Sequence, residues 1–187
     1  VIAVLNGGSV NQITDDRGNR FFNADGSLNT NPATRIPDSM KFTPFTGTTP
    51  TDLPDMFIFN NAENRTFNFS IAGDGAKTFR LFQPGDVFGT DFTGTGSIRC
   101  ENLLTNQRAL AIPAPDALAP TAVRMIKVRN LERVFEMNDF TGQLNLPILF
   151  RPAATGGSLD VETRGQLQFD ARLETFAAGT TRARTFA

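Results

Sequence analysis

A strict alternation of polar and apolar residues near the end of the chain constrains the fold more than any other feature. In the stretch QLQFDARLE, apolar residues occupy every second position, at Leu167, Phe169, Ala171 and Leu173, with polar or charged residues between them. A period of two places these apolar side chains on one face of a β-strand, whereas an amphipathic helix needs a period of about 3.6 residues. The preceding segment SLDVET alternates in the same way. The pattern predicts an antiparallel sheet with one face on the core and the other toward water or a partner.

A second alternating stretch, TFNFSIAGDGAKTFRLF at residues 66–82, predicts a β-hairpin. Phe67, Phe69 and Ile71 fall on one face of its first arm, and Gly73 and Gly75 lie in the connection, where a positive φ is expected. Three further segments bounded by polar or glycine residues have strand patterns, and they lie at residues 56–60, 86–92 and 96–103.

The segment TAVRMIKVRNLERVFEM, residues 121–137, is the one stretch that a helix could occupy. Its apolar residues do not form a clean helical face, whereas Ile126 and Val128 alternate with Lys127 and Arg129. Two strands are therefore favoured over one helix.

The next apolar segment, QLNLPILF, contains a proline at position 147. Leu144, Leu146, Ile148 and Phe150 share one face in a strand reading, with Pro147 on the other. Because proline cannot donate a ladder hydrogen bond, this segment is expected at a sheet edge or a bulge.

About ten short strands separated by glycine and proline predict an all-β chain, a two-sheet antiparallel β-sandwich for which the jelly-roll topology is favoured. The 187 residues suit one domain. We expect an extended arm and loops at 1–55, the β-sandwich core at 56–176 and a C-terminal tail at 177–187. The proline-rich segment 112–120 is expected to be an extended connection, and no internal repeat is visible.

The two ends of the chain are the expected assembly elements. The apolar segment VIAVL opens the chain, and its strand must pair with a distant segment of its own sheet or with the edge of a neighbouring subunit. The tail FAAGTTRARTFA carries two phenylalanines and two arginines. The candidate assembly residues are Val1, Ile2, Val4, Leu5, Phe176, Arg182, Arg184 and Phe186.

Composition argues against most catalytic chemistry. The chain has 18 phenylalanines but no histidine, tyrosine or tryptophan, so the usual general acid–base residue is missing. The single cysteine, Cys100, cannot form an internal disulfide and shares its parity with Ile98, which is typical of a buried strand cysteine. A net charge of −1 gives no basic footprint for sequence-specific nucleic acid. No apolar run is long enough to span a bilayer.

Carboxylate pairs and oxygen-rich loops are the remaining candidates for chemistry. Asp15 with Asp16, Asp52 with Asp55, and Asp86 with Asp91 are close in sequence, but all lie among turn residues, where aspartate bonds to nearby backbone. The loop NADGSLN resembles a calcium loop only in composition, because it lacks the EF-hand spacing. We therefore assign no catalytic residue, no metal ligand and no cofactor, and expect no enzyme.

In architecture, the region from Met56 to Phe176 resembles the jelly-roll subunits of virus and phage coats, and secondarily the β-sandwich pilins that exchange terminal strands. The resemblance rests on no motif and carries over no functional residue. It implies a self-assembling structural subunit of a virion, either capsid or decoration protein, whose partners are copies of itself and other structural proteins. Two alternatives remain: a pilin or cell-surface filament subunit, and a secreted carbohydrate-binding or adhesive module. The expected location is a virion or an extracellular surface assembly.

Overall fold

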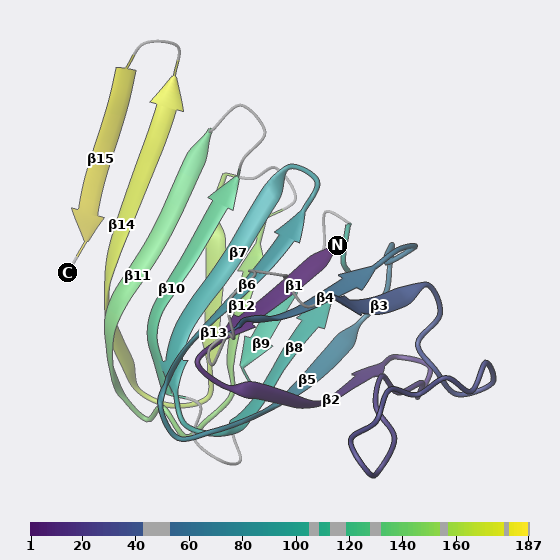
Figure 1. Ribbon diagram of the computed structural model, residues 1–187. Helices are drawn as coiled ribbons and strands as arrows, with labels where there is room; N and C mark the ends of the chain where they lie inside the picture. The colour runs from purple at the N-terminus through teal and green to yellow at the C-terminus, as the bar shows by residue number, and fades with distance from the viewer. Residues whose placement is uncertain are drawn as a thin grey trace.

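Two antiparallel sheets face each other in the computed structural model (Figure 1). The structure describes residues 1–42, 53–104, 109–112, 119–127, 132–153, 157–177 and 180–186, and these contain strands but no helix. The all-β class and the antiparallel two-sheet architecture are therefore confirmed. No helix within these ranges is long and apolar enough to cross a membrane.

The strands follow one another along the whole described chain. They are β1 (Ile2–Asn6), β2 (Ser9–Asp15), β3 (Ser39–Phe42), β4 (Asp55–Phe59), β5 (Phe67–Ala72), β6 (Ala76–Gln83), β7 (Asp86–Thr93), β8 (Gly96–Glu101), β9 (Ala109–Ile112), β10 (Ala119–Lys127), β11 (Arg133–Gly142), β12 (Ile148–Pro152), β13 (Leu159–Thr163), β14 (Leu167–Ala177) and β15 (Thr180–Phe186). The nine-stranded sheet has the order β15-β14-β11-β10-β7-β6-β1-β4-β3, and the six-stranded sheet has the order β13-β12-β9-β8-β5-β2.

From β6 onward the chain adds strands to the two sheets in turn, two at a time. β6 and β7 pair in the nine-stranded sheet, β8 and β9 in the six-stranded sheet, and this alternation continues through β10–β11, β12–β13 and β14–β15. Each new pair lies beside the previous pair of its own sheet. This order does not confirm the jelly-roll topology. The alternation in the sequence predicts strands and their faces, but it does not predict which strands become neighbours.

Phenylalanine provides most of the bulk between the sheets. The largest fully buried aromatic side chains are Phe57, Phe59, Phe67, Phe69, Phe79, Phe92 and Phe150. Their rings meet edge to face or tilted, as for Phe69 and Phe79 with centroids 5.2 Å apart. Such contacts stabilise aromatic pairs beyond their area burial. The expected core parity of Phe67, Phe69 and Ile71 is confirmed.

The extended arm expected at the N-terminus is not confirmed. β1 lies inside the nine-stranded sheet, where Val4 faces Met56 of β4 on one side and Arg80 of β6 on the other. Of the two partners expected for VIAVL, the distant segment of its own sheet is the one found, so its ladder has no free edge for a neighbouring subunit. Residues 43–52 of the expected arm lie outside the described residues.

Loops between β2 and β3 close one end of the sandwich. Residues 16–38 form turns and isolated bridges, and they bury Phe21, Phe22 and Ile36 in the core. The Phe21 ring packs 5.1 Å from that of Phe57. Figure 1 shows these loops beside β2 and β3, at the end opposite β14 and β15.

The later segments confirm most of the expected strands. Residues 119–127 and 133–142 form the strands β10 and β11 rather than a helix. β12 begins at Ile148, directly after Pro147, so Leu144 and Leu146 precede the strand instead of belonging to it. The proline ends the ladder because it has no N–H to donate. Most of the proline-rich connection, residues 113–118, lies outside the described residues.

The C-terminal tail is not confirmed as a free arm. Residues 180–186 form β15, an edge strand that pairs with β14 of the same chain. Thr181 to Thr185 are exposed.

Candidate functional site

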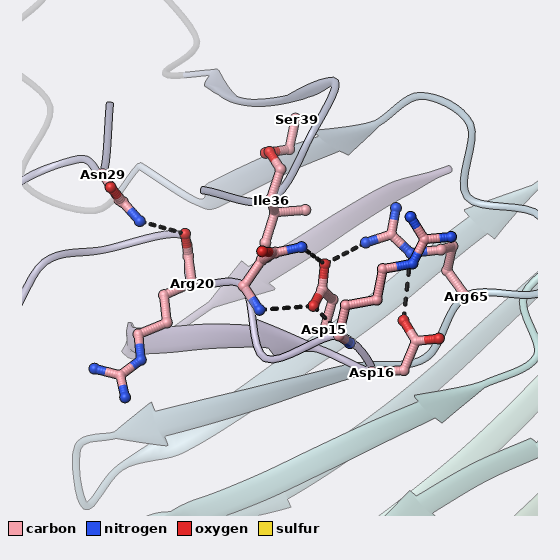
Figure 2. A network of polar contacts seen from close by, with 9 residues as sticks. Asp15, Asp16, Arg20, Asn29, Ile36, Ser39 and Arg65 are labelled. Atoms are coloured by element: carbon pink, nitrogen blue, oxygen red, sulfur yellow. Dashed lines mark hydrogen bonds and ion pairs between the residues drawn. The ribbon is translucent and has the colours of Figure 1, made fainter. Parts of the chain in front are cut away.

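The candidate carboxylate pair Asp15–Asp16 belongs to a structural network with Arg65 (Figure 2). The side chain of Asp15 is fully buried and forms an ion pair with Nη2 of Arg65. It also accepts hydrogen bonds from the backbone N–H of Arg17 at 2.9 Å and of Asn19 at 2.8 Å, and from the Asn19 amide at 2.8 Å. Asp16 accepts from Nε of Arg65 at 3.3 Å. With its oxygens engaged and shielded from solvent, Asp15 holds the start of the 16–38 loops against the sandwich.

The other two carboxylate pairs do not form a shared site either. Asp86 and Asp91 lie on opposite faces of β7, Asp86 buried between the sheets and Asp91 outside in an ion pair with Arg80 at 2.6 Å. Asp55 pairs with Lys41 at 2.5 Å, and its partner Asp52 lies outside the described residues. Within the described ranges, no group of three metal-binding side chains occurs.

The oxygen-rich loop around Asp25 forms an ordinary turn. Oδ1 of Asp25 accepts hydrogen bonds from the hydroxyl of Ser27 at 2.6 Å and from its backbone N–H at 3.0 Å. These donors, the hydroxyl first, lower the pKa of the Asp25 carboxyl from its ordinary value. The geometry is that of an aspartate bonding to backbone two residues ahead.

Cys100 lies in β8 with no exposed surface, on the same buried face as Ile98. Burial raises the pKa of its thiol well above the ordinary value, so the thiolate needed for nucleophilic chemistry is disfavoured. The interpretation of Cys100 as a core residue is confirmed.

Lys77 is a buried cation that the sequence patterns did not single out. It lies on the inner face of β6 with 2% of its surface exposed. Its ammonium donates to the carbonyls of Gly75 at 2.9 Å and Gly94 at 3.0 Å, and also to that of Gly73. Lys77 thereby ties the β5–β6 turn to the β7–β8 turn. The sequence signal that indicates its burial is that Lys77 shares the parity of Phe79 and Leu81, which lie on the inner face of β6.

A small cavity lies between the sheets among the described residues. It has a volume of about 20 Å³ and is lined by Leu81, Phe88, Met125 and Phe150, among others. This volume corresponds to about one water molecule. The cavity is too small for an organic ligand, whereas exposed apolar side chains lie on the outside of the sandwich.

An apolar row crosses the outer face of the nine-stranded sheet. Met40 of β3 lies opposite Ile58 of β4, Ile58 lies opposite Ile2 of β1, and Ile2 lies opposite Phe82 of β6. The row reaches Val87 of β7 and continues through Ile126 of β10 to Val134 of β11. Met40 is 52% exposed and Phe82 is 41% exposed, while Ile58, Ile2 and Val87 are partly exposed.

A second row lies beside the first and has the same character at one end. Phe42, Met56 and Val4 occupy facing positions of β3, β4 and β1, and Phe42 is 48% exposed. The row then reaches Arg80 of β6. We call the eight apolar residues that the two rows carry on β1, β3, β4, β6 and β7 the outer patch: Ile2, Val4, Met40, Phe42, Met56, Ile58, Phe82 and Val87.

Beyond the outer patch the same face of the sheet is charged. Arg124 of β10 lies opposite Glu136 of β11, which lies opposite Arg172 of β14, and Arg172 pairs with Glu174 at side-chain level. Directly opposite residues of opposite charge stabilise a sheet. The exposed apolar side chains of this face lie on β3 and β6, while Ile126 and Val134 extend one apolar row into β10 and β11.

The structure separates the candidate assembly residues at the N-terminus. Ile2 and Val4 belong to the outer patch, whereas Leu5 is buried between the sheets and has no surface to offer a neighbour. The amino group of Val1 donates to the carbonyl oxygen of Phe59 at 3.0 Å, and desolvation lowers its pKa.

The candidate assembly residues at the C-terminus lie on two edge-proximal strands. Phe176 is half-buried on β14, and Arg182 and Arg184 are exposed on β15. Phe186 lies opposite Ala171 in the ladder, and its side chain is outside the described residues. Sequence reasoning missed Met40, Phe42 and Phe82, because only the strand order brings them beside Ile2 and Val4.

Comparisons with protein-family models, curated proteins and solved structures gave no match for this chain. The outer patch must therefore be interpreted from its own chemistry.

Proposed function

We propose that the protein is a structural subunit that assembles with copies of itself through the outer patch. The observation that carries this proposal is the exposure of Met40, Phe42 and Phe82 on the face of a sheet whose other face is already packed. Strands that are apolar on both faces, such as VIAVL and MFIF, are typical of sheets covered on both sides. Contiguous exposed apolar surface commonly marks a protein interface.

A second copy is the simplest cover for this surface. The patch consists of apolar residues, so two patches related by a two-fold axis would place apolar residues against apolar residues. The charged part of the face, with Arg124, Glu136 and Arg172, would then form the rim. The narrower proposal from the sequence, a coat or decoration subunit of a virion, adds that such contacts repeat in a larger particle.

The oligomeric state tests this proposal. Size-exclusion chromatography with light scattering, over a range of protein concentrations, should show dimers or larger species, and negative-stain images should show whether they extend. The double variant Met40→Ser with Phe82→Ser should weaken association about tenfold or more, because it removes two exposed apolar side chains from the patch.

Leu149→Ser is the control rather than a substitution of the exposed Leu28, because Leu28 lines a surface hollow together with Met40 and is not independent of the patch. Leu149 is partly exposed on the outer face of β12, in the six-stranded sheet. This variant should associate like the wild type. A wild-type chain that stays monomeric at all concentrations would refute the proposal, and so would equal weakening by the control.

A further inference from the structure

The two ends of the sandwich are closed differently. At the end beside β2 and β3, the 16–38 loops bury Phe21, Phe22 and Ile36. At the other end the core stops without a covering segment among the described residues: Leu167, Phe169, Ala171 and Leu173 of β14 are only partly buried on the inner face. Phe169 stacks on Phe140 with centroids 5.3 Å apart, so the core reaches these residues.

The alternating order of the strands shows where the next strand would lie. After β14 and β15 join the nine-stranded sheet, the next position in the pattern is beside β13 in the six-stranded sheet. β13 pairs with β12 on one side, and the described chain places no strand on its other side. Leu159 and Val161 of β13 are partly buried against the core. A strand added there would extend the core beneath β14 and β15.

Two arginines of β15 add positive charge at this place, where Arg133 of β11 also lies opposite Thr175. Arg184 lies opposite Leu173 and Arg182 opposite Thr175 in the β14–β15 ladder. Leu173 in turn lies opposite Phe135, whose other neighbour is Met125 of the core. Directly opposite residues share a face, so both arginines belong to the inner side of the nine-stranded sheet. Both are exposed, and neither makes an ion pair with a described residue.

Charged residues on an edge strand can also serve to prevent unwanted pairing, and Arg182 and Arg184 would do so for β15 itself. That role does not account for β13, whose inner residues Leu159 and Val161 are apolar and whose second edge pairs with no strand of the described ranges. The apolar inner residues of β13 and the two arginines of β15 together form an apolar surface bordered by positive charge.

We propose that this end of the sandwich binds an extended segment of a second polypeptide as an added strand on β13. Apolar side chains of that segment pack on the inner face of β14, and acidic side chains on the same face pair with Arg182 and Arg184. Strand addition supplies the backbone hydrogen bonds, and the side-chain pattern supplies selectivity. The site is separate from the outer patch and does not depend on self-assembly through it.

Two labelled peptides of the same length test the proposal by fluorescence anisotropy. In VTVTETE the residues of one face are two valines followed by two glutamates, and in VTVTKTK the glutamates are lysines. The background is Met40→Ser with Phe82→Ser, so that assembly through the outer patch does not compete. The acidic peptide should bind at least about tenfold more tightly than the basic one, and added salt should reduce the difference.

The charge-reversal variant Arg182→Glu with Arg184→Glu should invert the preference. Arg17→Glu with Arg35→Glu is the matched control, since it changes net charge equally in exposed residues at the opposite end. Circular dichroism checks that each variant is folded, and Arg182→Gln with Arg184→Gln replaces the reversal if that variant does not fold. Hydrogen exchange should show added protection at residues 159–163 on peptide binding.

Three results would overturn the proposal. They are the absence of binding, equal affinity for both peptides, and protection that appears at another sheet edge instead of β13. None of them bears on the outer patch, whose test is the oligomeric state alone.

Discussion

Replacing Arg65 by methionine should destabilise the protein strongly, because it leaves the buried carboxylate of Asp15 without its cationic partner. The Asp15 side chain has no exposed surface and that of Arg65 is 8% exposed, so solvent cannot replace the lost charge. Removal of one member of a buried ion pair typically costs about 3–5 kcal/mol. Asp15 still accepts three hydrogen bonds, from the backbone N–H groups of Arg17 and Asn19 and from the side-chain amide of Asn19. We therefore expect a loss at the lower end of that range, about 3 kcal/mol.

Urea unfolding followed by far-ultraviolet circular dichroism measures this loss, since the chain has no tryptophan or tyrosine to report by fluorescence. Methionine preserves much of the aliphatic stem, which keeps contact with the Phe67 ring, 5.4 Å from the guanidinium carbon. Arg99→Met is the control. Its pair with Glu101 is 2.6 Å long but exposed, with side chains 45% and 28% accessible, and should contribute about 0–1 kcal/mol.

A double-mutant cycle separates the interaction energy of the Asp15–Arg65 pair from the other effects of each substitution on the loop. Asp15→Asn with Arg65→Met removes both charges, and the asparagine can still accept hydrogen bonds from the turn. The double variant should lose less than the sum of the two single losses, by about 1–3 kcal/mol. A loss for Arg65→Met no larger than that of Arg99→Met would refute this reasoning, and so would strict additivity.

Three further predictions concern the turns and the buried groups. Gly7→Ala should destabilise the protein by more than Gly18→Ala: both glycines have φ near +80° (+78° and +80°), but a Cβ at Gly7 would press on the carbonyl oxygen of Ala76 and one at Gly18 would meet nothing within 4 Å. Similar midpoints in urea would contradict this account. Cys100 should resist a thiol reagent in the folded protein and react fully after denaturation, because burial disfavours its thiolate; rapid reaction under native conditions would show that β8 opens. Desolvation lowers the pKa of the Lys77 ammonium below its ordinary value of 10.5. Just below pH 10.5 the unfolded chain therefore binds more protons than the folded chain. The charged form of Lys77 thus lowers the free energy of unfolding at neutral pH. The stability of the wild type relative to Lys77→Met should therefore rise as the pH approaches 10.5, and a difference independent of pH would contradict the shift.

Much of the local structure could be predicted from parity alone. The alternation at Phe67, Phe69 and Ile71 placed these residues on the core side, and the structure buries all three. Cys100 followed Ile98 into the core for the same reason. Local rules also explain why β12 starts later than the alternation indicates, because Pro147 ends the ladder before Ile148.

Only two residues of the outer patch, Ile2 and Val4, could be indicated from the sequence. The sequence indicates Ile2 and Val4 as contact residues, in a strand that pairs either with a distant segment of its own sheet or with another subunit. The structure pairs β1 with β4 and β6, which brings Ile2 between Ile58 and Phe82 and creates the outer patch. No window of sequence contains these residues together.

The sequence by itself determined the strands with clear alternation and which of their side chains share a face, since both depend on backbone geometry over a few residues. It did not reveal β2, β3 and β15, which lie in segments expected to be loops and a tail. Only the tertiary structure decided the neighbours: that β1 lies in the middle of a nine-stranded sheet, that the 16–38 loops close one end, and that β13 and β15 border the other. Every strand edge offers the same backbone donors and acceptors, so pairing across many residues of chain depends on which arrangement buries the most apolar surface at once.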